Sequence, residues 1–288
     1  MNVRRFAAAL TLAVSLTAAA AVGAQAGATG TWSIQPAAAA GQAHFDVDFA
    51  DLDSSGSDVH HSNDVDLASI GLSRATLETN GHVTFAFERE AGTFTCDGTM
   101  SDGRGGGTVT FNANADYQAK MRALGYDGMT LHDQIGAALL DVTTAYVESI
   151  ARAGYPHMPF SKLIAFRALG VDETFVRSMR ATFPSDLTAD DLIAMRALHV
   201  TSDYVNELRA MGFSIDAPRN AISLMALHVD AAYARALAGA GYSHLTAREL
   251  VELRAMKIDA AYIQRVRDHG IKNPTVEQLV RLKAMNII

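Results

Sequence analysis

The sequence predicts an α+β protein, with a small antiparallel β domain at residues 27–112 and a helical repeat domain at residues 113–288. In the β domain apolar and polar residues alternate, as in strands that bury one face. In the helical domain a single helical pattern recurs every 29 residues without an insertion. The composition, 49% hydrophobic and 19% charged, is typical of a folded chain.

Residues 1–26 are predicted to be a secretory signal peptide. Arg4 and Arg5 precede an apolar run that ends in Ala24-Gln25-Ala26, a pattern of small residues typical of a cleavage site. The alternative is an uncleaved membrane anchor, although the apolar run is short for a spanning helix. Because no other stretch looks able to span a bilayer, we expect an exported bacterial protein, periplasmic or secreted, with no membrane span after signal cleavage.

The β domain is predicted from the segments "TWSIQ", "HFDVDF", "HVTFAF", "GTFTCDG" and "GGTVTFNA", which are separated by turn residues. They favour an antiparallel meander of five or six strands, arranged as a small sandwich or half-barrel. Phe94 and Cys96 should share one face of a strand. Cys96 is the only cysteine, so no internal disulfide can form. We expect it to be a core residue, with intermolecular pairing or a reactive thiol as the alternatives.

The acidic segment 44–66 is the candidate cation site, for Ca²⁺ or Zn²⁺. The stretch "DLDSSGSDVHHS" begins like a calcium loop, but its twelfth position is Ser62 rather than glutamate and the preceding segment is a strand. Carboxylate and imidazole ligands are nevertheless plentiful there. The candidate ligands are Asp51, Asp53, Asp58, His60 and His61. The alternative is an acidic strand face that runs into a polar loop, with no cofactor.

The helical domain is predicted from residue columns that recur every 29 residues. The aromatic column is Tyr117, Tyr146, Phe175, Tyr204, Tyr233 and Tyr262. Good N-cap residues precede it at Asn114, Thr143, Asp172, Thr201, Asp230 and Asp259. Helices of about ten residues are too short to be stable alone, so each must pack on its neighbours. The pattern therefore predicts an α-solenoid of about six helical hairpins.

Two sets of arginines recur in the last turns of these helices. One set is Arg167, Arg196 and Arg254, and the other is Arg180, Arg209 and Arg267. The structural interpretation is that each cation complements a helix dipole and reaches free backbone carbonyls. The functional interpretation is a ladder of guanidinium groups that binds an acidic partner. Both interpretations are open at this stage.

The charge distribution argues against a nucleic-acid-binding protein. Residues 27–115 hold twelve acidic and three basic residues, whereas residues 116–288 hold nineteen of each. Neither region has the clustered positive charge that displaces counterions from nucleic acid. The sequence also lacks HExxH, GxSxG and CxxC motifs, which gives no support to an enzyme.

The segments "REAGTFTCDGTMSDGRGGGTVTFNANADYQAKMRALGY" and "LTADDLIAMRALHVTSDYVNELRAMGF" carry a resemblance to a group of exported bacterial proteins with a small β domain and "LRALGV"-type helical repeats. Similar repeats occur in the extracytoplasmic tails of β-lactam-sensor-type membrane metallopeptidases. The resemblance covers residues 30–288 and implies the fold alone. The peptidase zinc motif and membrane helices are absent here, so no peptidase or acylation activity follows from it.

These observations favour a non-enzymatic exported protein that binds a protein partner in the cell envelope through its helical surface. A second hypothesis is a ligand-sensing or envelope-stress-sensing accessory protein that uses the acidic segment. A third is an enzyme whose site is assembled from residues that no motif reveals. The oligomeric state does not follow from the sequence.

Overall fold

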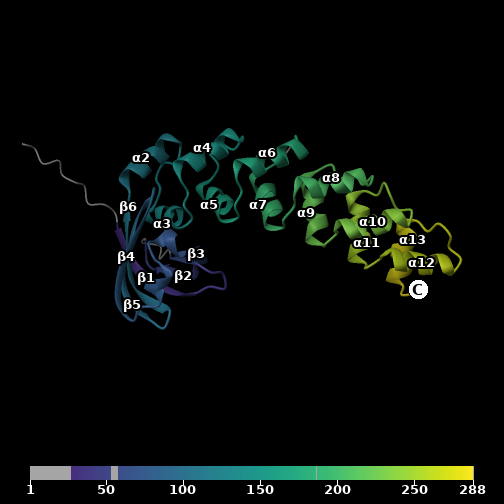
Figure 1. Ribbon diagram of the computed structural model, residues 1–288. Helices are drawn as coiled ribbons and strands as arrows, with labels where there is room; N and C mark the ends of the chain where they lie inside the picture. Colours follow the sequence, from purple (N-terminus) through teal and green to yellow (C-terminus); the bar gives the residue numbers. More distant parts are fainter. Residues whose placement is uncertain (1–26, 53–57, 186, 288) are drawn as a thin grey trace, which may run out of the picture.

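The computed structural model describes residues 27–52, 58–185 and 187–287, so the predicted signal peptide and Asp53 lie outside the described residues. Within these ranges the protein is α+β, with a six-stranded antiparallel sheet followed by a series of short helices. The sheet lies at one end of an elongated molecule, and the helices extend away from it towards the C-terminus (Figure 1).

The six strands form one sheet in the order β3-β2-β1-β6-β5-β4. They are β1 (Gly27–Pro36), β2 (Gln42–Phe49), β3 (Val59–Asp66), β4 (Gly81–Arg89), β5 (Gly92–Ser101) and β6 (Arg104–Ala113). The antiparallel strands are as predicted, but their order is not that of a single meander. Strand β1 pairs with β6, with Trp32 opposite Gly107, and joins two three-stranded meanders into one sheet.

The glycines of β5 and β6 make room for the indole ring of Trp32. A Cβ atom added to Gly98 would lie 2.8 Å from the Trp32 ring, and one added to Gly105 would lie 3.2 Å from it. Neither position could hold a larger residue without displacing the ring. An added Cβ would also lie 2.3 Å from the Gly106 carbonyl oxygen at Gly98 and 2.3 Å from Met100 Sδ at Gly105, so these glycines serve the close approach of β5 and β6 as well as the Trp32 ring.

The segment that the sequence analysis treats as a polar loop is strand β3, which corrects that element of the prediction. Its residues pair with β2 from Gln42 opposite Asp66 to Phe49 opposite Val59. Strand β3 lies at the edge of the sheet, and its inward side chains Val59, His61 and Val65 are only half-buried. The alternation of apolar and polar residues that identifies a strand is therefore weak here.

One face of the sheet carries the core of the β domain. The rings of Phe87 and Phe94 stack with centroids 4.7 Å apart, and Phe111 packs against Phe94 at 4.8 Å. Cys96 is fully buried beside them, and burial raises the pKa of its thiol to about 12. The burial of Cys96 confirms its predicted core role.

Short helical segments complete this core. The 3-10 helix η1 (Leu67–Ile70) and helix α1 (Arg74–Leu77) connect β3 to β4, and both contribute buried leucines. Helix α3 (Leu131–Leu139) contacts β3, β5 and β6, so the helical region begins directly on the sheet.

The helices after β6 form two interleaved series, each with starts 29 residues apart. The even-numbered series is α2 (Ala115–Ala123), α4 (Thr144–Arg152), α6 (Glu173–Thr182), α8 (Ser202–Ala210), α10 (Ala231–Gly239) and α12 (Ala260–Asp268). The odd-numbered series continues from α3 with α5 (Phe160–Ala168), α7 (Ala189–Ala197), α9 (Pro218–Ala226), α11 (Ala247–Ala255) and α13 (Val276–Ala284). The predicted period is thus present in the helix boundaries.

Local capping explains where these helices begin. The side chains of all six predicted N-cap residues of the even-numbered series accept a hydrogen bond from a backbone N–H of the first turn. Thr188 and Thr246 each form the predicted capping box, with Asp191 and Glu249 respectively. Because a cap depends on residues three positions apart, the sequence is sufficient to locate it.

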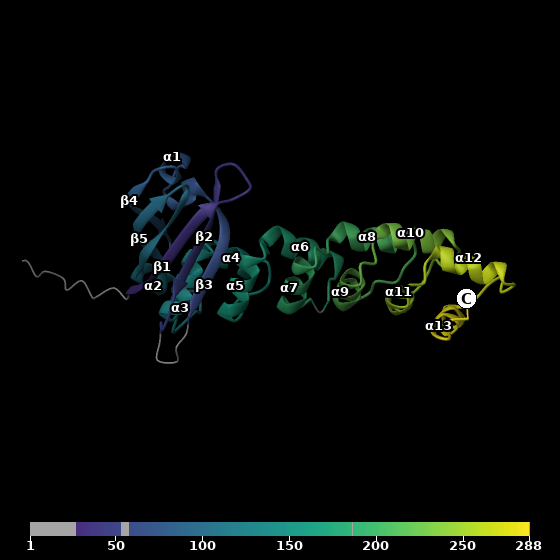
Figure 2. The ribbon, with the colours of Figure 1, turned by 90° about the horizontal axis from the view of Figure 1, so that it is seen from below.

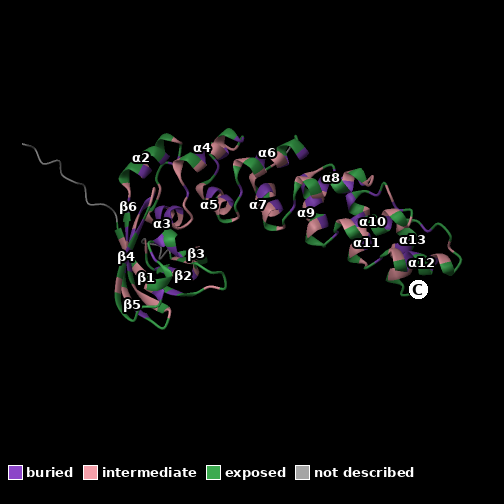
Figure 3. Ribbon diagram, viewed as in Figure 1, coloured by how far each residue is buried: buried purple, intermediate pink, exposed green. Residues whose placement is uncertain are grey.

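The two series form two rows along the molecule (Figures 1 and 2). Contacts join helices that lie two places apart along the chain, as between α4 and α6, α6 and α8, or α7 and α9. The buried residues lie on the sides of the helices that face each other, and exposed residues cover both outer sides (Figure 3). No helix in the described ranges is long and apolar enough to cross a membrane.

A carboxylate at the turn between β4 and β5 ties the sheet to the helices. Glu90 accepts hydrogen bonds from the backbone N–H of Thr144 at 2.8 Å and from its hydroxyl at 2.7 Å, at the start of α4. Lys120 lies 3.6 Å away. Burial opposes the charge of Glu90, but the Thr144 hydrogen bonds and Lys120 outweigh it and lower the pKa of the carboxyl. The sheet therefore helps to cap α4.

Candidate functional site

The three candidate arginines on odd-numbered helices reach the odd-numbered helix two places earlier. Arg167 Nε donates to the Leu140 carbonyl at 2.9 Å, Arg196 Nε to Leu169 at 3.1 Å, and Arg254 Nε to Leu227 at 3.1 Å. Each acceptor is the C-cap residue of its helix. Carbonyls at this position have no partner within their own helix.

The three candidate arginines on even-numbered helices make the equivalent contact in the other row. Arg180 donates to the Ala153 carbonyl at 2.9 Å, Arg209 to Thr182 at 3.1 Å, and Arg267 to Ala240 at 2.6 Å. In all six cases donor and acceptor are 27 residues apart. The arginines donate to carbonyls at helix C-termini, as the structural interpretation predicts. The carbonyls, however, belong to the helix two places earlier and not to the helix that carries the arginine.

Each of these guanidinium groups also lies over an aromatic ring. The distances to the ring centroid are 5.2 Å for Arg167 over Tyr146, 5.1 Å for Arg196 over Phe175, 4.8 Å for Arg254 over Tyr233, 5.8 Å for Arg180 over Tyr155, 5.1 Å for Arg209 over Phe183 and 5.9 Å for Arg267 over Tyr242. Cation–π attraction adds to the hydrogen bonds. Both sets of arginines thus connect helices that follow one another within the same row. That these arginines bind an acidic partner stays a prediction.

The tyrosines of the aromatic column add a second tie between neighbouring helices. Four of the five tyrosine hydroxyls donate to the carbonyl 25 residues later, from Tyr117 to Val142, Tyr146 to Val171, Tyr204 to Val229 and Tyr233 to Ile258, over 2.6 to 2.8 Å. Burial raises the pKa of Tyr233 to about 12, so the hydroxyl stays protonated as a donor. Phe175 has the same place in the column but has no hydroxyl to donate.

The residues proposed as cation ligands are not gathered at one point. The Asp51 N–H donates to Asp58 Oδ1 at 3.0 Å, whereas His60 projects from the outer face of β3 with Nδ1 2.5 Å from Asp48 Oδ1. His61 projects from the opposite face, where burial lowers its pKa. The fifth candidate, Asp53, lies outside the described residues. In the described ranges no group of three or more His, Cys, Asp or Glu side chains is arranged to hold a metal ion.

The outer face of β2 and β3 carries a hydrogen-bonded chain that the sequence analysis misses. Ser62 Oγ lies 2.9 Å from His44 Nε2, and His44 Nδ1 lies 2.9 Å from Asp64 Oδ1. His44 is directly opposite Asp64 in the sheet, and Asp46 is directly opposite Ser62. Polar residues at alternate positions of both segments could have indicated this cluster. They predict contacts between the two segments only when β3 is known to be a strand that pairs with β2.

Asp46 belongs to the same cluster. Its Oδ1 lies 3.4 Å from His44 Nε2, and its Oδ2 accepts a hydrogen bond from Ser33 at 2.9 Å. A hydrogen bond from Ser62 lowers the pKa of Asp46; desolvation opposes this, and Ser33 and His44 add to the lowering. The cluster therefore pairs one imidazole with two carboxylates and one hydroxyl.

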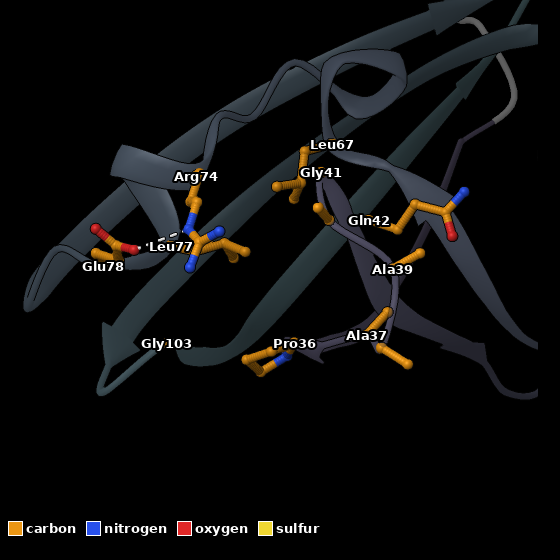
Figure 4. Close-up of a pocket in the computed structure, with 12 residues that line it drawn as sticks. Pro36, Ala37, Ala39, Gly41, Gln42, Leu67, Arg74, Leu77, Glu78 and Gly103 are labelled. Carbon is orange, nitrogen blue, oxygen red and sulfur yellow. Dashed lines mark hydrogen bonds and ion pairs between the residues drawn. The ribbon is translucent and has the colours of Figure 1, made fainter.

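A pocket of about 290 Å³ lies at the end of the sheet, between the loop at residues 36–42 and helix α1 (Figure 4). Leu67 and Leu77 are among its apolar lining residues. Its charged residues, Arg74 and Glu78, pair with each other at 3.1 Å and are 76% and 65% exposed. With its charges satisfied by one another, the pocket offers few groups that could orient a ligand.

Comparisons of the chain with protein-family models, with curated proteins and with solved structures find no match.

Proposed function

We propose that the helical region is an α-solenoid of about six 29-residue hairpins and that its surface is a non-enzymatic scaffold for protein binding in the bacterial cell envelope. The observation that carries this proposal is the recurrence of the same arginine and tyrosine contacts between successive helices, over intervals of 27 and 25 residues. Repeated contacts of this kind build a long and regular surface, which repeat proteins use to bind partners.

A basic depression on this surface is the first place to look for the contact. Arg152 and Arg177 line it together with the edge of Arg180, and its volume is about 540 Å³. Arg152 and Arg177 are 60% and 62% exposed and share Glu173 as an ion-pair partner. Because exposed ion pairs contribute little free energy, these arginines can release Glu173 and pair instead with a carboxylate of an acidic partner.

Affinity capture of the full protein from its own envelope extract tests the proposal. We expect a protein to co-purify with the unmodified chain and to be lost when Arg152 and Arg177 are both changed to glutamate. Changing Arg219 and Arg248 to glutamate is the matched control, because these exposed arginines lie on odd-numbered helices. All forms should unfold at similar temperatures, since each replaced side chain is largely solvated.

The result that contradicts the scaffold is the absence of any co-purifying or cross-linked protein with the unmodified chain. A partner that both variants retain would contradict the basic depression as its contact. The export on which the experiment depends is itself a proposal, which fractionation of cells that express the full chain would test.

A further inference from the structure

The cluster on the outer face of β2 and β3 has the connectivity of an activated nucleophile. A hydroxyl, an imidazole and a carboxylate are joined in series by two contacts of 2.9 Å, from Ser62 through His44 to Asp64. Such constellations are recognised by geometry and by the role of each group, and they recur on unrelated folds.

The hydrogen bonds determine what each group can do. In the tautomer that carries its proton on Nδ1, His44 donates to the Asp64 carboxylate, which when ionised only accepts hydrogen bonds. The lone pair of Nε2 then faces the hydroxyl of Ser62, 2.9 Å away, whose single proton can turn either to Nε2 or to the Asp46 carboxylate. His44 is therefore positioned to take the hydroxyl proton as a general base.

Asp46 has two opposing effects on this reaction. Its carboxylate lies 3.4 Å from His44 Nε2 and favours the imidazolium that forms when the proton arrives. The same negative charge disfavours an oxyanion next to Ser62. Ser62 is exposed on an open sheet face, where water rather than preorganised donors meets that oxyanion. The cluster should therefore react only with carbonyl or phosphoryl groups that carry good leaving groups.

We propose that Ser62 is a nucleophile that His44 activates, that Asp64 is its positioning residue, and that activated esters are its substrate class. Ser62 Oγ forms a bond to the acyl carbon while the bond to the leaving oxygen breaks. The hydroxyl proton passes through His44 Nε2 to the leaving group, and water then hydrolyses the acyl-serine. This activity of the β domain goes beyond the scaffold role of the helices.

A fluorophosphonate probe tests the proposal on the full chain, because its phosphorus bonds to an activated serine as fluoride leaves. Intact mass and peptide mapping should place one adduct on Ser62. His44→Gln should slow the labelling by roughly 100-fold, the lower range for loss of a general base. Asp64→Asn should slow it less, and Asp64→Glu should restore part of the rate, because a carboxylate again orients the imidazole.

Two matched variants on the same face serve as controls. His60→Gln removes an imidazole paired with Asp48, and His82→Gln removes an imidazole paired with Asp97. Both should label within about twofold of the unmodified protein, and circular dichroism should show every variant folded. The proposal is overturned if labelling of Ser62 does not exceed that of other serines, or if His44→Gln leaves the rate unchanged.

Discussion

Replacing Arg209 by alanine removes a guanidinium that three hydrogen bonds hold between helices. Nη1 donates to the Thr182 carbonyl at 3.1 Å, and Nε and Nη2 donate to the Ile215 carbonyl at 3.1 and 2.6 Å. The guanidinium also lies 5.1 Å from the centroid of the Phe183 ring. Thr182 and Ile215 are buried, so their carbonyls depend on the arginine.

The magnitude follows from these contacts. A hydrogen bond from a charged donor contributes about 1.5–3 kcal/mol, and an exposed cation–π contact contributes about 0.5–1 kcal/mol. Arg209 is itself half-buried, and water can replace some of what alanine removes. We therefore expect Arg209→Ala to lower the free energy of unfolding by about 3 kcal/mol, against a typical total of about 5–15 kcal/mol.

Urea unfolding followed by circular dichroism measures this loss. The matched control is Arg235→Ala, because Arg235 is 65% exposed and bonds only to the surface carboxylate of Glu207 at 2.6 Å. An exposed pair of this kind contributes under about 1 kcal/mol. Arg209→Lys should fall between the two, since lysine keeps the charge but not the planar fork.

Helical repeats can unfold in segments, so hydrogen exchange of residues 173–215 should accompany the urea measurement. We expect Arg209→Ala to speed exchange there and Arg235→Ala not to. If Arg209→Ala costs no more than Arg235→Ala by both measures, the arginines do not hold the helices together and the structural interpretation of both sets is wrong.

Three further predictions can be checked by the same unfolding measurements. Gly154→Ala should destabilise the fold by about 1–3 kcal/mol. Gly154 has a φ of +107°, which side chains rarely adopt, and its new Cβ would collide with the guanidinium of Arg180. The control is Gly239→Ala, which should stabilise the fold by up to about 1 kcal/mol because the space around its Cβ is open. Phe175→Tyr should stabilise by about 1 kcal/mol, because its hydroxyl can donate to the Val200 carbonyl; a neutral or negative change would contradict the assumed contact. Because the pKa of Glu90 is lower in the folded protein than in the unfolded chain, its carboxylate stabilises the fold at pH values above the unfolded pKa of 4.5. This stabilisation is lost as the pH falls through the folded pKa. Glu90→Gln should therefore flatten the acid side of a stability–pH curve, and an unchanged slope would count against the contact.

Much of the fold could be predicted from the sequence because its signals are local. Thr188 and Asp191 form a capping box within four residues, and the helices follow the predicted period. His199 and His228, 29 and 58 residues after Gly170, share its left-handed conformation, with φ values of 58° and 55° against 68°. Strand β3 was missed because a half-buried edge strand carries no clear alternation.

The candidate sites were harder to predict because they depend on which residues meet across strands or helices. Asp58, His60 and His61 are close in sequence and share ligand chemistry, yet a strand places the two histidines on opposite faces. Ser62 and His44 are 18 residues apart and meet only through the register of β2 and β3. Composition predicts a supply of reactive groups, but register decides which of them meet.

The sequence by itself determined the division into a β domain and a helical domain, the helix starts and the 29-residue period, because caps and buried columns depend on near neighbours and on hydrophobicity. Only the tertiary structure decided the partners of the arginines and tyrosines, which lie 27 and 25 residues away. It also decided the strand order, through the pairing of β1 with β6. The physical reason is that hydrogen bonds between distant segments depend on orientation in space, which no local pattern of residue types encodes.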